Sequence, residues 1–224
     1  MALGLTKLQQ QTLDFFAKSD LSKKFYWTGG TLLSTVYLNH RFSEDIDLFS
    51  DKPFLASEIN DFVESLKKKL GLKNVVPRKI HDRLEFLITN GDKLRIEFVL
   101  YEHPKLKSRK TWNGILIDSM FDIGVNKTMA MFDRNEAKDI FDLYFLVADK
   151  HLQVKDLLAG VNKKFGLKMP EDGFWSESMK ALNNLEKIKP FLIANSEKEK
   201  GETIEKIKKF FLSRSSLYLH GFLK

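Results

Sequence analysis

The chain has 224 residues, a formal net charge of +7 and an apolar content of 43%. This length allows one large domain or two small ones, and the apolar content excludes a chain that stays disordered for lack of a core. Cysteine is missing from the sequence, which excludes disulfides, thiolate metal sites and a cysteine nucleophile and fits a reducing compartment. The positive charge suits a polyanionic partner such as RNA or a nucleoside triphosphate, and a solvated lysine-rich surface is the simpler interpretation.

The first residues, MALGLTKLQQQTLDFF, lack the uninterrupted apolar segment of a signal peptide. No stretch of the sequence reaches the roughly 18 to 20 apolar residues that span a bilayer. We therefore expect a cytoplasmic protein with no membrane partner.

The first half of the chain mixes helical and strand-like patterns. Apolar spacing predicts helices over 5–18, 31–39 and 55–70, and strands over 24–28, 43–50, 83–89 and 93–100. The Asn-Gly pair between the last two strands is typical of a tight β-hairpin turn. In the last strand, Arg95 and Glu97 share the face opposite Ile96 and Phe98.

After about residue 118 the pattern becomes helical. Apolar spacing predicts helices over 119–134, 136–150, 153–165, 174–188 and 201–213. We expect an α+β protein in which a small mixed sheet flanked by helices, residues 1–116, is followed by a helical bundle, residues 117–224.

Asp45 and Asp47 are the first candidates for a functional site. At strand spacing their carboxylates project from one face, where like charges repel each other unless a cation is present. Hard divalent ions compensate such a pair, and Mg²⁺ bound by carboxylates and substrate phosphates is the usual form. The alternative is an edge strand whose polar face lies in water. Without ion or nucleotide, we expect the two aspartates to be a local source of strain.

Gly29 and Gly30 precede the helix predicted from Thr31. Glycine lets the backbone approach a phosphate closely, and a helix N-terminus offers unpaired N–H groups to it. A phosphate cradle joined by one helix to a pair of aspartates points to phosphoryl or nucleotidyl transfer. Glu97, on the polar face of the hairpin, is either a third metal ligand or a cross-strand partner of an arginine.

Two blocks of sequence carry a family resemblance. The first reads GGTLL at 29–33 and HRFSEDIDLF at 40–49; the second reads NKTMA at 126–130, Arg134, and KDIFDL at 138–143. Together they resemble the nucleotidyltransferase AbiEii toxin family, within the polymerase-beta-like nucleotidyltransferase superfamily. Lys138 stands where that family usually has arginine, and Glu97 stands where related enzymes often have aspartate.

The resemblance implies a polymerase-beta-like fold and a metal-dependent enzyme. Such an enzyme moves a nucleoside monophosphate from an NTP to an acceptor hydroxyl and releases pyrophosphate, with two Mg²⁺ ions as cofactors. The implied metal ligands are Asp45, Asp47 and Glu97, and the implied catalytic set adds Lys127, at the triphosphate, and Asp142. The implied nucleotide-binding residues are Gly29, Gly30, Thr31, Arg41, Ser43, Lys127, Arg134 and Asp139.

The second block also has a geometric interpretation. Lys127 and Arg134 fall on one face of a helix, and Asp139 and Asp142 lie three residues apart on the next helix. An inter-helix salt bridge among these residues is the alternative to a role in catalysis.

The resemblance further suggests a bacterial type IV toxin–antitoxin toxin that acts on RNA, at the tRNA 3′ end, with a cognate antitoxin encoded nearby. Two other functions stay open: a small-molecule nucleotidyltransferase that modifies an antibiotic, and a catalytically silent nucleotide- or protein-binding module. The sequence does not fix the NTP, the acceptor, the oligomeric state or the role of residues after about 150.

Overall fold

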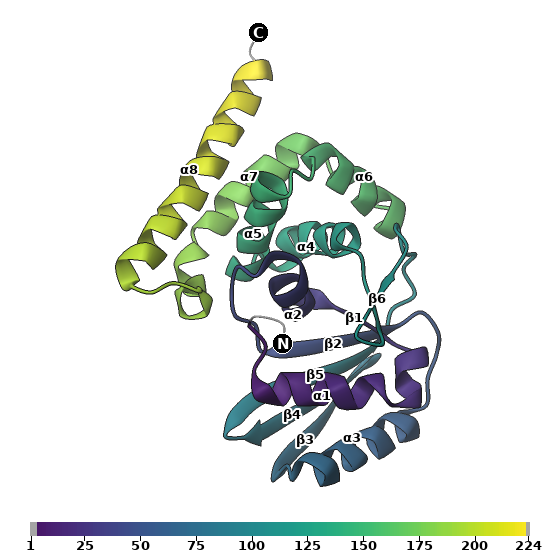
Figure 1. The fold of residues 1–224 in the computed structure, drawn as a ribbon. Helices are drawn as coiled ribbons and strands as arrows, with labels where there is room; N and C mark the ends of the chain where they lie inside the picture. Colours follow the sequence, from purple (N-terminus) through teal and green to yellow (C-terminus); the bar gives the residue numbers. More distant parts are fainter. Residues whose placement is uncertain (1–3, 223–224) are drawn as a thin grey trace. The chain divides into compact units, whose positions relative to one another are not determined.

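The computed structural model describes the backbone of residues 4–222, and the side chains of these residues except 90 and 219–222. The chain forms two compact units, Met1–Met120 and Phe121–Lys224, which are described separately. Figure 1 traces the strands through the first unit and a succession of helices through the second. The expected division into a nucleotidyltransferase core, residues 1–116, and a helical domain, residues 117–224, stays a prediction.

Within the described residues, the first unit is built on a seven-stranded mixed sheet. The strands are β1 (Tyr26–Thr28), β2 (Asp45–Ser50), β3 (Asn74–Ile80), β4 (Arg83–Asn90), β5 (Asp92–Leu100), β6 (Lys110–Trp112) and β7 (Ile115–Ile117). Their order in space is β3-β4-β5-β2-β1-β7-β6. Strand β2 therefore lies in the centre, antiparallel to β1 and parallel to β5.

One face of this sheet forms the core of the first unit. Two helices cover it, α1 (Lys7–Ala17) and α3 (Ala56–Leu70) (Figure 1). Ile46 of β2 and Phe98 of β5 are fully buried beneath them. The ring centroids of Phe16 and Phe62 are 6.0 Å apart, and those of Phe62 and Phe98 are 5.9 Å apart, both edge-to-face. Such aromatic packing fixes the helices on the sheet and leaves the opposite face to the charged side chains of the strands.

The predicted helices and strands of the first half are confirmed, with one shift. The helix expected from residue 31 begins at Gly29: α2 (Gly29–Leu32) continues as a π-helical segment, Leu33–Leu38. The two glycines are thus the first residues of the helix and do not precede it. Helix α1 begins after Thr6, whose side chain forms a reciprocal capping box with Gln9.

Strands β3, β6 and β7, and a short 3-10 helix, Asp20–Lys23, were not predicted. β3 is an edge strand that is exposed along nearly its whole length and contains Pro77, so it has no alternation of apolar and polar residues to indicate a strand. β6 and β7 have three residues each, which is too short for a periodic pattern to emerge.

The second unit is helical. Its elements are α4 (Met120–Arg134, whose first residue belongs to the first unit), α5 (Ala137–Tyr144) with a π-helical continuation (Phe145–Asp149), α6 (Val154–Phe165), α7 (Glu171–Leu182), a 3-10 helix (Leu185–Phe191) and α8 (Glu197–Phe222). Its core includes Met131, Phe141, Phe174 and Phe211, all fully buried. In the described part of the chain, no helix is both long enough and apolar enough to cross a membrane.

The predicted helix over 174–188 is wrong in its extent. Helix α7 runs from Glu171 to Leu182, and a separate 3-10 helix follows. Two asparagines, Asn183 and Asn184, separate them, and Pro190 lies inside the 3-10 segment, where it cannot donate a backbone hydrogen bond. The predicted α+β class itself is confirmed.

Candidate active site

The start of α2 packs directly against charged side chains. Gly29 has φ +80°, and a Cβ atom there would overlap the carboxylate of Asp47. A Cβ atom on Gly30 would come within 2.9 Å of Nη2 of Arg41, which is itself buried. The glycine pair therefore lets an acidic strand and a guanidinium approach the helix backbone, a reason for glycine that is additional to phosphate binding.

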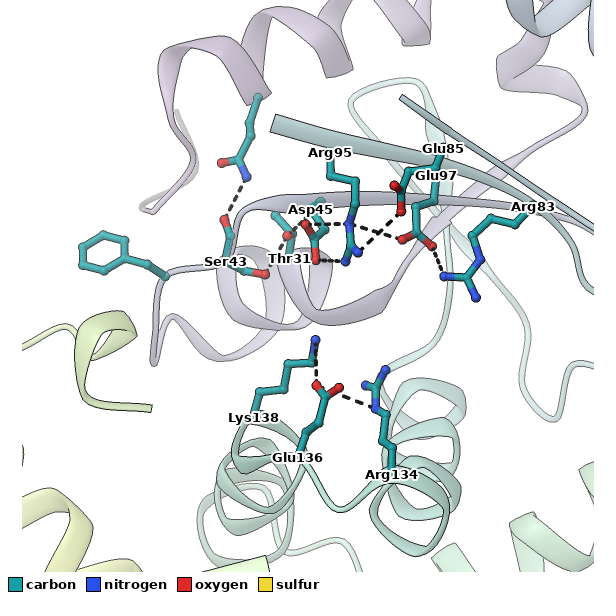
Figure 2. A network of polar contacts seen from close by, with 12 residues as sticks. Thr31, Ser43, Asp45, Arg83, Glu85, Arg95, Glu97, Arg134, Glu136 and Lys138 are labelled. Carbon is teal, nitrogen blue, oxygen red and sulfur yellow. Dashed lines mark hydrogen bonds and ion pairs between the residues drawn. The ribbon is translucent and has the colours of Figure 1, made fainter. Parts of the chain in front are cut away.

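Thr31 and Ser43 position the residues before β2. Thr31 is fully buried, its hydroxyl donates a hydrogen bond to the carbonyl oxygen of Asp45, and its Oγ1 lies 2.8 Å from Oγ of Ser43 (Figure 2). The side-chain amide of Gln9 donates to the carbonyl oxygen of Ser43 at 2.8 Å. These bonds tie the entry of β2 to α1 and α2, so both hydroxyls have a positioning role in this structure.

Asp45 and Asp47 lie on the face of β2 opposite Ile46 and Leu48, as the spacing predicts. Both aspartates are partly exposed, whereas the two apolar residues are buried. The alternative of a solvated edge strand is wrong, because β2 has a strand on each side. The parallel register sets Asp45 opposite Arg95 and Asp47 opposite Glu97 on β5.

Arg95 is the central cation of this face, and the predicted set of site residues did not contain it. Its Nη2 and Nε both bind the Asp45 carboxylate, Nε at 3.1 Å from Oδ1. Nε also lies 3.2 Å from Oε1 of Glu97, and Nη1 lies 3.6 Å from Oε2 of Glu85. Figure 2 shows the guanidinium between the three carboxylates. The expectation that the aspartate pair is strained without a ligand is therefore corrected for Asp45, which an internal cation compensates, and stays a prediction for Asp47.

The electrostatics of Arg95 are consistent with this contact. Burial disfavours its charged form, but the hydrogen bonds that it donates to Asp45 and the charges of Asp45, Glu97 and Asp47 outweigh burial and raise the pKa of Arg95. A signal for Arg95 was present in the sequence, because it lies two residues before Glu97 in the same alternating run and must share its face.

Glu97 pairs with arginines on its own and the neighbouring strand, as expected if it is a cross-strand partner of arginine. Besides Arg95, it binds Arg83, whose Nη1 lies 3.2 Å from Oε2 of Glu97. Glu85 is paired in the same way, with Arg78 at 3.7 Å. Among the described residues, no three acidic or imidazole side chains are grouped so that they could hold a metal ion. The Arg95 guanidinium thus lies between the carboxylates of Glu97 and Asp45.

The donor chemistry of Asp45 and Asp47 nevertheless fits a hard divalent cation. Both present carboxylate oxygens, the ligands that Mg²⁺ prefers. Asp45 already binds one cationic group, Arg95, which shows that the position attracts positive charge.

The second unit contains a compact ionic cluster that matches the predicted helical faces. Nζ of Lys127 lies 2.8 Å from Oδ1 of Asp139 and 2.7 Å from Oδ2 of Asp142. Arg134 donates to both oxygens of Asp139, at 2.9 and 3.1 Å. Lys138 pairs with Glu136 at 3.0 Å, and Nε of Arg134 lies 3.9 Å from the same carboxylate (Figure 2). The inter-helix salt bridge considered as an alternative is therefore formed.

Both carboxylates of this cluster are fully buried. Burial raises the pKa of Asp139, but the charge of Lys127 and the hydrogen bond and charge of Arg134 outweigh burial and lower it. Asp139 therefore stays ionised, and its charge holds Lys127 and Arg134 in fixed positions.

The fold and this site define a class of protein: an α+β nucleotidyltransferase, in which a central strand carries two aspartates beside a helix that begins with two glycines. Residues 12–213 match the family described as Nucleotidyl transferase AbiEii toxin, Type IV TA system. The chain belongs to this family, which confirms the predicted resemblance and fold.

The chain is also similar to other known proteins. The uncharacterized protein aq_aa25 of Aquifex aeolicus (strain VF5) is 32% identical over 165 residues, which cover 72% of this chain and 76% of the relative. The crystal structure of JHP933 from Helicobacter pylori superimposes with a TM-score of 0.59, covers 96% of this chain and 94% of its own, and is 19% identical. At that identity the likeness concerns the fold.

Proposed function

We propose that the protein is a divalent-metal-dependent nucleotidyltransferase that moves a nucleoside monophosphate from an NTP to a hydroxyl of an RNA acceptor, with tRNA as the first substrate to test. The observation that carries the proposal is the position of Asp45 and Asp47 on one face of the central strand, with Asp47 against the glycine that begins α2. Family membership supports nucleotide transfer.

Asp45 and Asp47 would hold the Mg²⁺ ions, which supply charge compensation for the phosphates and activation of the acceptor hydroxyl. Gly29 and Gly30 would lie along the phosphates, with Arg41 over Gly30 as a further positive charge. Glu97 has the implied role of a third ligand only if Arg83 and Arg95 release it. The acceptor hydroxyl attacks the α-phosphorus, and pyrophosphate leaves.

Lys127 and Asp142 keep the roles that the family resemblance implies. Lys127 would neutralise the β- and γ-phosphates, and Asp142 would hold the ammonium group through the 2.7 Å ion pair. Asp139 and Arg134 complete the cluster that orients Lys127.

The net charge of +7 favours a polyanionic acceptor over a cationic aminoglycoside. A toxin role, with a cognate antitoxin as partner, is part of the proposal and follows from the family. Expression of the chain alone, compared with coexpression of the neighbouring reading frame, tests that role by growth.

The decisive experiment measures transfer of label from each of the four NTPs to total tRNA and, in parallel, to aminoglycosides. We expect labelled tRNA that disappears on chelation of divalent metal and in the variants Asp45→Asn and Asp47→Asn. Asp61→Asn, an exposed aspartate of α3, is the matched control. Label on aminoglycosides alone would establish a small-molecule transferase. Full transfer by a variant that combines Asp45→Asn with Asp47→Asn would refute the metal mechanism.

A further inference from the structure

The charged face of the sheet in the first unit carries more than the two aspartates. The strand registers place four carboxylates and three guanidiniums on this face: Asp45, Asp47, Glu85, Glu97, Arg78, Arg83 and Arg95. Arg78 pairs with Glu85 and Arg83 pairs with Glu97. Arg95 binds Asp45 of β2 as well as both glutamates.

We propose that Arg95 is an internal competitor of the metal ion: it occupies Asp45 in the nucleotide-free protein and moves aside to Glu97 and Glu85 when metal arrives with the nucleotide. This inference rests on the proposed function and adds the regulation of the same site. Arg95 is a positioning residue, since it acts through Asp45.

The geometry supports a competition between the two cations. Arg95 binds both oxygens of the Asp45 carboxylate, so a metal ion has to compete with the guanidinium for these oxygens. A divalent ion beside an unmoved guanidinium would face a like charge at close range in a partly desolvated setting, which opposes binding. The negative charge of a bound triphosphate removes this opposition.

The geometry also provides a place for the displaced guanidinium. Glu97 and Glu85 are buried, with side chains 7% and 5% exposed, whereas the Arg95 side chain is 34% exposed. Both glutamates lie within 3.6 Å of Arg95, so the arginine can leave Asp45 without losing its other carboxylates. A flexible side chain with a planar five-donor head can change partners in this way.

The test is binding of Mn²⁺ alone, measured by the loss of the free-ion EPR signal and by thermal unfolding, with no nucleotide present. For Arg95→Gln we expect Mn²⁺ affinity at least about tenfold higher than that of the wild type, because the competitor is gone. Arg83→Gln is the matched control, because Arg83 binds Glu97 from β4, which β5 separates from the strand of Asp45, and it should bind Mn²⁺ like the wild type. Arg95→Gln combined with Asp45→Asn should lose the gain.

If Arg95→Gln does not fold, Arg95→Lys keeps the proposed competition testable. The ammonium group of lysine is compact and cannot bind both oxygens of Asp45 while it also binds both glutamates. We therefore expect an intermediate Mn²⁺ affinity for this variant. A non-hydrolysable NTP analogue should raise the Mn²⁺ affinity of the wild type more than that of Arg95→Gln.

The outcomes separate this inference from the function on which it rests. Equal Mn²⁺ affinities of the wild type and both Arg95 variants, together with nucleotide transfer by the wild type, would overturn the competition and leave the transferase intact. A gain in Arg95→Gln without any transfer by the wild type would support the competition and refute the proposed reaction. No Mn²⁺ binding by any variant, with or without the NTP analogue, would refute both.

Discussion

Replacing Gly29 with alanine tests whether the glycine pair serves the aspartate strand. Alanine at φ +80° costs about 1 kcal/mol in backbone strain. Its Cβ atom would also overlap the Asp47 carboxylate, so the aspartate has to retreat, which adds about 1–3 kcal/mol as in an overpacked core. Displacement of a proposed metal ligand should lower nucleotide transfer by about a hundredfold.

Gly71→Ala provides the matched control. Gly71 also has a positive φ, +63°, but a Cβ atom there would meet no other atom within 4 Å. Urea unfolding followed by tryptophan fluorescence should therefore show the backbone term alone in Gly71→Ala and both terms in Gly29→Ala. Adding Asp47→Ala to Gly29→Ala should reduce the second term, because only the Cβ atom of that side chain would remain, 2.9 Å from the added Cβ atom. Equal losses of stability in the two glycine variants would refute the reasoning.

Three further changes probe the charged residues. Lys127→Met leaves the fully buried Asp142 without its cation and should destabilise the protein by about 3–5 kcal/mol in urea unfolding, with partial recovery on adding Asp142→Asn; a loss below about 1 kcal/mol would contradict the cluster. The pKa of Asp139 is lowered from its usual 3.8, so its ionised form contributes stability above that pH, and this stability is lost as the pH falls through the lowered pKa. Acid unfolding of Asp139→Asn should therefore depend less on pH below about 4 than that of the wild type. An unchanged pH profile would count against the lowered pKa. Glu97→Gln, acting through Arg95, should slow single-turnover transfer by about 10- to 100-fold, less than Asp45→Asn does; equal losses would identify Glu97 as a metal ligand in its own right.

The sequence predicted the elements whose signal is periodic. The alternation in β2 and β5, and the Asn-Gly turn before β5, were sufficient to place Asp45, Asp47 and Glu97 on polar faces of adjoining segments. The pairing of β2 with β5 was not predictable, because parallel neighbours are far apart in the chain and no local pattern specifies their register.

What the sequence missed in the site follows from that limit. Arg95 was seen as a residue on the polar face, but its partner Asp45 lies 50 residues away and only the register brings them together. For Thr31, the position in the motif indicated a phosphate ligand. Its complete burial and its hydrogen bond to the Asp45 carbonyl oxygen depend on tertiary packing, which the sequence pattern does not contain. Residue type and spacing identified the participants, and packing decided their contacts.

The alternation of β5 serves the core and the charged face at the same time. Ile96 and Phe98 fill the interior, and Arg95 and Glu97 alternate with them on the other side. Inserting or deleting one residue within this strand would exchange the two sets, burying a guanidinium among aromatic rings and exposing the apolar residues. The length of β5 is therefore fixed, because an insertion or deletion of one residue disrupts the site and the core at the same time.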